Sequence, residues 1–392
     1  MSPNPALSAV RVRGPFMGSS GYDHHVREFV RELHRQGVAV ELHDLPEWGP
    51  TRLPSELRDR WFESLDAPVA ASVGLHFCMP TQVRPFPNTA TVNYTMFEAT
   101  RIPAAWAAHS RQHDLVVLPT ESSRRAWLAA GVPSERLRLC PLGINPNMFD
   151  NDVEPLPLRD AAGEPLSRYR VRFLNVSELG PRKNLTGLLR AWLLGTKRSD
   201  DALLIIKLSP FSADRLSLFQ AELDQLQRSL GKPIAEAAPV HFINKLFSDE
   251  QMPRLYAAAT HYISLSHGEG WDQAMMEAAA SGLRLIAPAH SAYLSYLDAK
   301  VARLVTSEEV PAAFADVDGL QRLFAGANWW EPDENEAVAA LRAALKGQDH
   351  PAASARERVR HEFTWEQAMR RLISILEEIT PRRRRRWHWK GV

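Results

Sequence analysis

The chain has 392 residues, of which 45% are hydrophobic and 24% are charged. These fractions are typical of soluble globular proteins and exclude a largely disordered or fibrous chain. Because single hydrophobic cores stop growing below this length, the length favours two domains. The 47 basic and 46 acidic side chains leave a net charge of only +1, so no global field favours a nucleic-acid partner.

The cysteines and the apolar runs indicate a cytoplasmic protein. Cys78 and Cys140 are too few for a disulfide framework, and no Cys/His cluster has the spacing of a zinc site. The segment 1–14 has no long apolar region, and no later apolar run reaches the roughly 18 residues that span a bilayer. We therefore predict neither a metal ion nor a cofactor.

The first half of the chain alternates short strands with helices. A strand is predicted at 9–13, a glycine-rich loop at 14–21, a helix at 22–36 and a second strand at 38–42. This order predicts a parallel sheet with helices on both faces. Further strands are predicted at 72–77, 91–96 and 115–118.

A second unit of the same kind follows a Pro-, Asp- and Gly-containing connection at 151–168. Its βα alternation predicts an α/β protein of two Rossmann-like domains, over 1–160 and 161–361. The predicted strands of the second unit are 172–176, 202–208, 240–242, 261–265 and 283–287, and its helices include 186–194 and 249–258.

Two carboxylates flank the start of a predicted helix in the second unit. Glycines 268 and 270 free the turn after a strand, Asp272 can cap the helix, and Gly282 ends it. With about 1.5 Å of rise per residue, Glu277 lies roughly 8 Å along the axis from the loop that carries Glu269. The helix N-terminus suits phosphates, and carboxylates suit sugar hydroxyls.

A pair of cations, Arg182 and Lys183, follows the predicted strand at 172–176. Parallel α/β sheets bind ligands at the carboxyl ends of their strands, so the pair is placed where a ligand is expected. The alternative is a pair of surface charges that precede a helix.

Together these elements resemble the retaining glycosyltransferase family 4, which has the GT-B fold. Glu269 and Glu277 match its Glu-x7-Glu motif, and 173–192 is similar to the segment with its diphosphate-binding Arg and Lys. The resemblance covers most of 14–380. It implies two Rossmann-like domains that face each other across a cleft, the donor on the C-terminal one, and a helix at 362–380 that packs back toward the N-terminal one.

Two positions depart from the family pattern. Glu178 stands where an Arg is common, and we take Arg182 as its replacement. Many members carry a His near position 98 that faces the donor sugar. Glu98 is the nearest polar candidate here, and a carboxylate at a helix start is the alternative.

The resemblance implies that the two cations hold the diphosphate, Glu269 the sugar and Glu277 the ribose. The loop at 243–248 is similar to one that contacts the nucleobase, and 14–21 is similar to a glycine loop that approaches a diphosphate or acceptor; for both, an ordinary loop or turn is the alternative. The predicted catalytic residues are Glu98, Arg182, Lys183 and Glu269. The predicted donor-binding residues are Gly18, Gly21, Arg182, Lys183, Lys245, Leu246, His267, Glu269, Gly270, Trp271, Asp272 and Glu277.

The implied function is transfer of a hexose-type sugar from a nucleoside-diphosphate sugar to a glycan, lipid-linked glycan or small-molecule acceptor. A non-catalytic nucleotide-sugar-binding subunit and a GT-B epimerase or phosphorylase are the alternatives. The C-terminal segment 381–392 carries five consecutive arginines and two tryptophans. Arg382–Lys390 is therefore either a peripheral contact with an anionic inner membrane surface or a solvated end.

Overall fold

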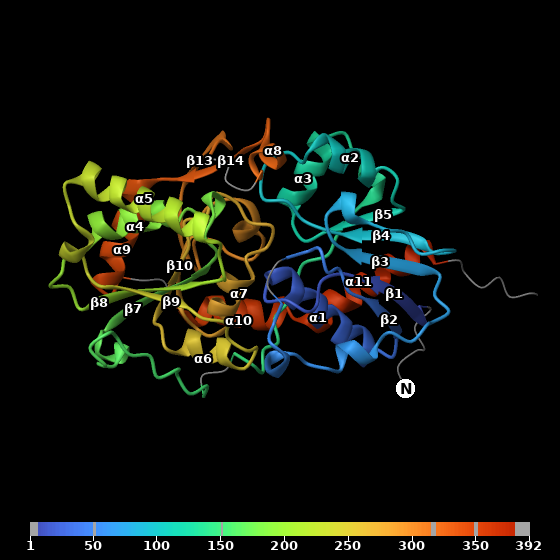
Figure 1. The fold of residues 1–392 in the computed structure, drawn as a ribbon, viewed down its shortest axis with the longest axis horizontal. Coiled ribbons are helices and arrows are strands. Elements are labelled where there is room, and N and C mark those ends of the chain that lie inside the picture. Colours follow the sequence, from blue (N-terminus) through green and yellow to red (C-terminus); the bar gives the residue numbers. More distant parts are fainter. Residues whose placement is uncertain (1–6, 50–51, 150–151, 315–318, 349–351, 381–392) are drawn as a thin grey trace, which may run out of the picture.

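The computed structural model describes residues 7–49, 52–149, 152–314, 319–348 and 352–380. Two α/β halves lie side by side, each built on a parallel six-stranded sheet (Figure 1). The predicted fold class of two Rossmann-like domains is thereby confirmed. The segment Arg382–Lys390, for which a membrane contact is predicted, lies outside the described residues.

The N-terminal sheet has the strand order β2-β1-β3-β4-β5-β6. Its core strands are buried throughout, as in β3, because helices cover both faces. Its elements are β1 (Ala9–Arg13), α1 (Gly21–Arg35), β2 (Ala39–His43), β3 (Val73–Phe77), β4 (Ala90–Tyr94), α2 (Ala104–Ser110), β5 (Leu115–Leu118), α3 (Glu121–Ala129) and β6 (Leu137–Leu139).

The C-terminal sheet has the order β12-β11-β10-β7-β8-β9. Its six strands thus follow the 3-2-1-4-5-6 order of Rossmann sheets. Its elements are β7 (Val171–Ser177), α4 (Leu185–Gly195), β8 (Ala202–Leu208), α5 (Ala213–Leu230), β9 (Val240–Asn244), α6 (Gln251–Ala257), β10 (His261–Ile263), α7 (Gln273–Ala280), β11 (Arg284–Pro288), β12 (Arg303–Val305) and α9 (Glu334–Leu345).

The strand order determines where this sheet can hold a ligand. It reverses between β7 and β10, which pair in parallel although β8 and β9 come between them in the chain. The loops after these two strands diverge to opposite faces and leave a crevice, which is where open α/β sheets bind ligands. Both predicted clusters, 178–184 and 264–272, lie in these two loops.

Two segments tie the C-terminal half to the N-terminal one. The antiparallel hairpin of β13 (Ser307–Pro311) and β14 (Asn328–Pro332), with α8 (Gln321–Phe324) between its strands, reaches α2 and α3 (Figure 1). The Phe97 and Phe324 rings stack at 5.1 Å there. The last two helices, α10 (Ala352–Glu362) and α11 (Trp365–Ile379), lead back to the N-terminal half, where α11 packs against α1.

Most predicted strands occur within one or two residues of their expected bounds, and helix 22–36 is observed as α1. The strands β6 and β12 and the hairpin are not predicted from the sequence. β6 and β12 have only three residues each, and β13 carries half-exposed polar side chains. None of these three strands therefore gives a clear apolar pattern. Among the described residues, no helix is long and apolar enough to cross a bilayer.

Candidate active site

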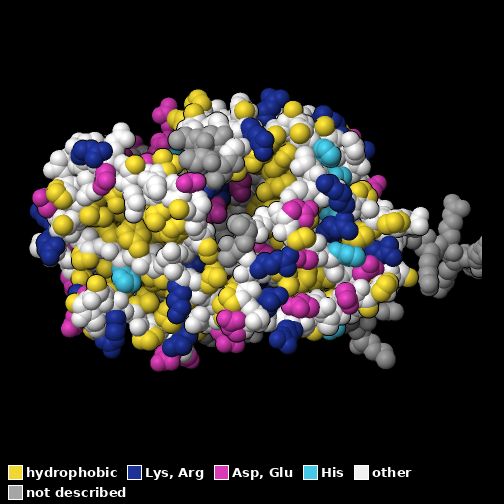
Figure 2. Space-filling model, viewed as in Figure 1, with side chains coloured by type: hydrophobic (Ala, Val, Ile, Leu, Met, Phe, Trp, Pro, Cys, Tyr) yellow, Lys and Arg dark blue, Asp and Glu magenta, His cyan; other side chains and the backbone are white. Residues whose placement is uncertain are grey.

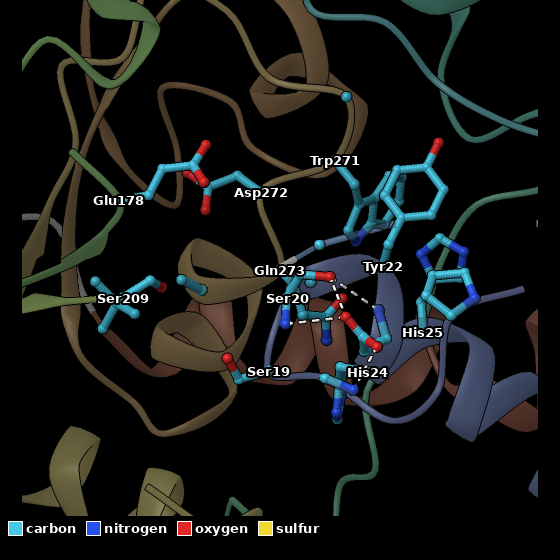
Figure 3. Close-up of a pocket in the computed structure, with 18 of the residues that line it drawn as sticks. Ser19, Ser20, Tyr22, His24, His25, Glu178, Ser209, Trp271, Asp272 and Gln273 are labelled. Carbon is cyan, nitrogen blue, oxygen red and sulfur yellow. Dashed lines mark hydrogen bonds between the residues drawn. The ribbon is translucent and has the colours of Figure 1, made fainter. Parts of the chain in front are cut away.

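A cleft between the two halves holds a pocket of about 720 Å³ that both domains line. The surface is hollowed there, and acidic side chains are visible within the hollow (Figure 2). Side chains of both domains surround the pocket, among them Tyr22, Glu178 and Asp272 (Figure 3). The volume falls within the range of small-molecule binding sites.

The turn after β7 presents Arg182 and Lys183 to this pocket. A short 3-10 turn carries both cations and ends at Asn184, which has left-handed backbone angles. The Asn184 side chain accepts from the Gly187 amide at 3.0 Å, which caps α4, and donates to the Leu265 carbonyl at 3.0 Å. Asn184 therefore fixes the cation turn against the loop after β10.

Glu269 lies between the two cations. Arg182 Nη1 donates to Glu269 Oε2 at 2.8 Å, and Lys183 Nζ donates to Oε1 at 2.7 Å. Burial alone would raise the pKa of Glu269, but the charges of Arg182 and Lys183 outweigh it and lower the pKa to about 2. Glu269 is thus a carboxylate at neutral pH, and the two cations are held in place before any ligand binds.

Asp272 begins α7 with a left-handed backbone, φ 58°, and its side chain accepts from the Met275 amide at 3.2 Å. Tyr293 donates a further hydrogen bond to it at 2.7 Å. Burial and the neighbouring Glu269 charge raise the pKa of Asp272 to about 6. This carboxyl therefore caps the helix in a setting that disfavours its charge.

Glu277 lies on α7 and lines the same pocket. The Tyr256 hydroxyl donates to its Oε2 at 2.8 Å. Its Oε1 lies 3.9 Å from His24 Nε2, which belongs to the N-terminal domain. Burial raises the pKa of Glu277, and the charge of His24 opposes the rise. Glu277 is thus a positioned acceptor at the interface of the two domains.

Glycines 268 and 270 let the loop after β10 contact the N-terminal domain. A Cβ on Gly268 would lie 2.0 Å from the Glu98 carbonyl oxygen, and one on Gly270 would lie 2.5 Å from Met96 Sδ. Backbone without side chains is required at both points. This contact brings Glu98 beside the Arg182 and Glu269 charges, and burial raises the pKa of Glu98 while Arg182 opposes the rise.

The N-terminal glycine loop is stabilised by its own side chains. The Gly18 amide donates to Asp23 Oδ1 at 2.6 Å, and Ser20 and Asp23 form a capping box at the start of α1. A Cβ on Gly18 would meet the Asp23 carboxylate, whereas one on Gly21 would enter open space. Both glycines line the pocket. The Gly18 amide already has a partner, so close packing explains this glycine.

The remaining predicted donor-binding residues lie in different surroundings. Leu246, Gly270 and Trp271 line the pocket. Lys245 is exposed and does not line it. His267 lies behind the cation turn, where its ring contacts the Pro181 carbonyl at 3.0 Å and Glu331 at 2.8 Å, and it does not line the pocket either.

Several pocket residues are not predicted from the sequence. Lys207 is the penultimate residue of the apolar strand β8 and is 7% exposed. A lysine in an otherwise apolar buried strand is the signal that could have found it. Tyr22, Tyr256 and Asp249 also line the pocket, and no local motif marks them. Among the described residues, no group of three His, Cys, Asp or Glu side chains could hold a metal ion.

Solved structures with the same architecture cover nearly all of the chain. HepE of Anabaena in complex with UDP and glucose matches with a TM-score of 0.65 at 13% identity, over 95% of this chain and 100% of its own. Sucrose-phosphate synthase of Thermosynechococcus elongatus matches with a TM-score of 0.65 at 16% identity, over 95% and 98%. The chain has the GT-B fold.

A third GT-B match is the E. coli trehalose-6-phosphate structure bound with UDP-2-fluoro glucose. Its TM-score is 0.64 at 13% identity, over 96% of this chain and 100% of its own. No family model and no curated protein matches the sequence. At these identities the GT-B likeness establishes the fold, and the chemistry must be argued from the pocket.

Proposed function

We propose that the chain is a retaining glycosyltransferase of family 4. It would transfer a hexose-type sugar from a nucleoside-diphosphate sugar to a glycan, lipid-linked glycan or small-molecule acceptor. One observation carries the proposal: Arg182, Lys183 and Glu269 meet at the crevice of the C-terminal sheet, with Glu277 on the helix that follows. Cations match the phosphates of such a donor, and carboxylates match its sugar and ribose hydroxyls.

The two cations stabilise the leaving group. As the sugar bond breaks, negative charge develops on the diphosphate, and only groups already oriented toward it lower the barrier without reorganising. Arg182 and Lys183 are oriented in this way by Glu269 at 2.8 and 2.7 Å. An incoming diphosphate shares them with Glu269, whose carboxylate then accepts from sugar hydroxyls.

Glu277 and Glu98 contact the two ends of the donor. Glu277 accepts from Tyr256 through Oε2, and we expect Oε1, which lies 3.9 Å from His24, to accept from a ribose hydroxyl. Glu98 faces the sugar from the N-terminal domain. The leaving phosphate takes the acceptor proton, so no carboxylic acid is required. Glu269, with a pKa of about 2, is unsuited to act as one.

The assay uses UDP-, GDP- and ADP-sugars with a broad acceptor panel. The uridine nucleotides named with the similar structures make UDP-glucose the first donor to test. We expect donor hydrolysis or transfer by the wild type, with the product anomer unchanged as read by NMR. Glu269→Gln should remove activity, and Glu308→Gln, the same change at an exposed position outside the pocket, is the matched control.

Other outcomes distinguish the alternatives. Nucleotide binding without turnover on any acceptor would support a non-catalytic subunit. Sugar release that depends on added phosphate would support a phosphorylase, and conversion of the donor sugar without transfer would support an epimerase. A product with inverted anomeric configuration would contradict the retaining proposal.

A peripheral membrane contact through Arg382–Lys390 is a separate proposal that the sequence alone supports. Each basic residue near an anionic surface contributes about 1 kcal/mol. We expect the full chain to sediment with vesicles containing phosphatidylserine and a chain ending at Thr380 not to. Equal sedimentation of both chains would contradict it.

A further inference from the structure

Lys207 is a buried cation inside the C-terminal sheet. Its strand, Ala-Leu-Leu-Ile-Ile-Lys-Leu, is buried at all seven positions, and Lys207 is 7% exposed. By register it lies between Val176 of β7 and Ile243 of β9. Its side chain lines the pocket between the domains. Lysine is almost never buried to this degree unless it is paired.

Among the described residues, no side chain or carbonyl accepts a hydrogen bond from the Lys207 ammonium. Burial lowers its pKa, and the charge of Glu277 opposes the fall. An ammonium group carries three donors and no acceptor, and leaving it buried without an acceptor is costly. The ammonium is reached from the pocket that Lys207 lines, so the pocket is the side from which an acceptor of a ligand can approach it.

The position of Lys207 indicates which part of a donor it meets. The phosphate cations and the sugar-side carboxylate lie together in the Arg182, Lys183 and Glu269 cluster. The charge that acts on Lys207 is instead that of Glu277, the proposed ribose contact. Its neighbour Ile243 leads directly into the loop whose Leu246 lines the pocket. Lys207 therefore lies beyond the ribose, at the nucleoside end.

Apolar side chains line the pocket together with Lys207. Val176, its register neighbour on β7, is one of them, and Leu246 and Phe247 of the loop after β9 are two more. Phe247 and Val176 also pack against the core, which holds them in place. Apolar lining with an ammonium donor fits a nucleobase that presents an acceptor at its edge.

We propose that Lys207 donates a hydrogen bond to a carbonyl oxygen of the donor's nucleobase and so selects uracil or guanine over adenine. This inference rests on the proposed function. Uracil and guanine carry carbonyl oxygens and adenine has none; in place of guanine O6 it has an amino group, which is a donor and cannot accept from an ammonium. The same contact thus favours one class of base and rejects the other.

The test is calorimetric binding of UDP, GDP, ADP and inorganic pyrophosphate to the wild type and to Lys207→Met. Wild type should bind UDP or GDP more tightly than ADP. Lys207→Met should weaken the preferred nucleotide about tenfold or more, the effect of one hydrogen bond from a charged group. Affinity for pyrophosphate, which has no base, should change less than twofold, as should all affinities in the exposed control Lys197→Met.

Three results would overturn the inference. An equal loss of pyrophosphate affinity in Lys207→Met would place Lys207 on the phosphates, and an unchanged base preference would remove it from recognition. Both leave the proposed transferase intact, whereas a wild type that binds no nucleotide contradicts the transferase as well. If Lys207→Met does not fold, Lys207→Gln, which keeps a neutral donor, is measured in the same way and should retain part of the preference.

Discussion

The two walls of the cleft are built differently. The C-terminal wall consists of ionised groups fixed by one another, as in Arg182 and Lys183 on Glu269. On the N-terminal wall, Asp23 is satisfied by the Gly18 amide and its own capping box, and the aromatic ring of Tyr22 lies 4.4 Å from that of Trp48. The C-terminal wall therefore provides a fixed electrostatic field, and the N-terminal wall provides an aromatic and polar surface.

Under the proposed function, this difference gives the two domains different tasks. A fixed field stabilises developing charge, because the groups need not reorganise as the reaction proceeds. An aromatic and polar surface recognises an acceptor by contact and hydrogen bonds. Substitutions on the C-terminal wall should therefore reduce the rate of the chemical step, and substitutions at the junction of the walls should act on the contact between the two domains.

The largest effect is expected from removing one cation of the C-terminal wall. Lys183→Met leaves the developing diphosphate charge with one cation instead of two, and loss of one such donor costs about 10²–10³ in rate. The fall should appear in kcat with the active donor sugar. Lys300→Met controls for loss of an exposed lysine. A full rate in Lys183→Met would mean that the charged wall is not the phosphate site.

The second effect concerns the buried carboxyl of Asp272 at the start of α7, whose charged form is disfavoured. Asp272 has a pKa of about 6 against an ordinary 3.8, so the folded protein binds a proton more tightly there than the unfolded chain does. Its contribution to stability is full below pH 3.8 and is lost as the pH rises through about 6. The shift corresponds to about 3 kcal/mol.

Asp272→Asn isolates this contribution. Asn retains the cap and tolerates the left-handed backbone, so only the titration is removed. Urea unfolding between about pH 4.5 and 7 should show a smaller fall of stability in the variant. Burial also raises the pKa values of Glu98 and Glu277, so part of the slope persists. An unchanged slope would mean that Asp272 is ionised across this range.

The third effect tests the contact between the walls. In Gly270→Ala, the added Cβ would lie 2.5 Å from Met96 Sδ and 2.9 Å from Met96 Cβ, so Met96 and the loop that carries it must shift. Overpacking of this kind costs about 1–3 kcal/mol. We expect a lower Tm and a larger radius by small-angle scattering. Gly21→Ala, where a Cβ meets open space at the same pocket, is the control and should keep the wild-type radius.

The same contrast explains what could be predicted from the sequence. The C-terminal wall comes from two short loops, so the spacing of Glu269 and Glu277 and the adjacent pair Arg182 and Lys183 were visible as motifs. The sheets were visible because buried parallel strands such as β8 are continuous apolar runs. The spacing could not predict that Glu269 forms ion pairs with both cations, because this depends on the order of the strands in the sheet.

Contacts between distant segments escaped prediction for a physical reason. Phe324 packs on Phe97 across more than half the chain, and Asp249 faces α1 of the other domain. Neither residue has a local pattern that distinguishes it from ordinary loop or core. His267 shows that a neighbour in sequence need not be a neighbour in the site. It lies close to Glu269 in the motif, but its ring points behind the motif, toward Glu331.

The smallest effect is expected from the charges that join the two walls between Asp249 and α1. Asp249 lies 3.7 Å from Arg27 and 4.0 Å from Arg31, both on α1 of the N-terminal domain. Its side chain is 39% exposed, so solvent screens these pairs, and each contributes about 0.2–1 kcal/mol. Asp249→Asn should weaken donor binding less than about fivefold at low salt.

Salt separates this electrostatic contribution from a direct contact. At about 1 M salt the screening length is near 3 Å, so the difference between Asp249→Asn and wild type should disappear. A double-mutant cycle with Arg31→Met should give a coupling that shrinks in the same way. A loss that persists at high salt would mean that Asp249 itself contacts the nucleotide, and Asp249 would then belong to the donor site rather than only to the contact between the two domains.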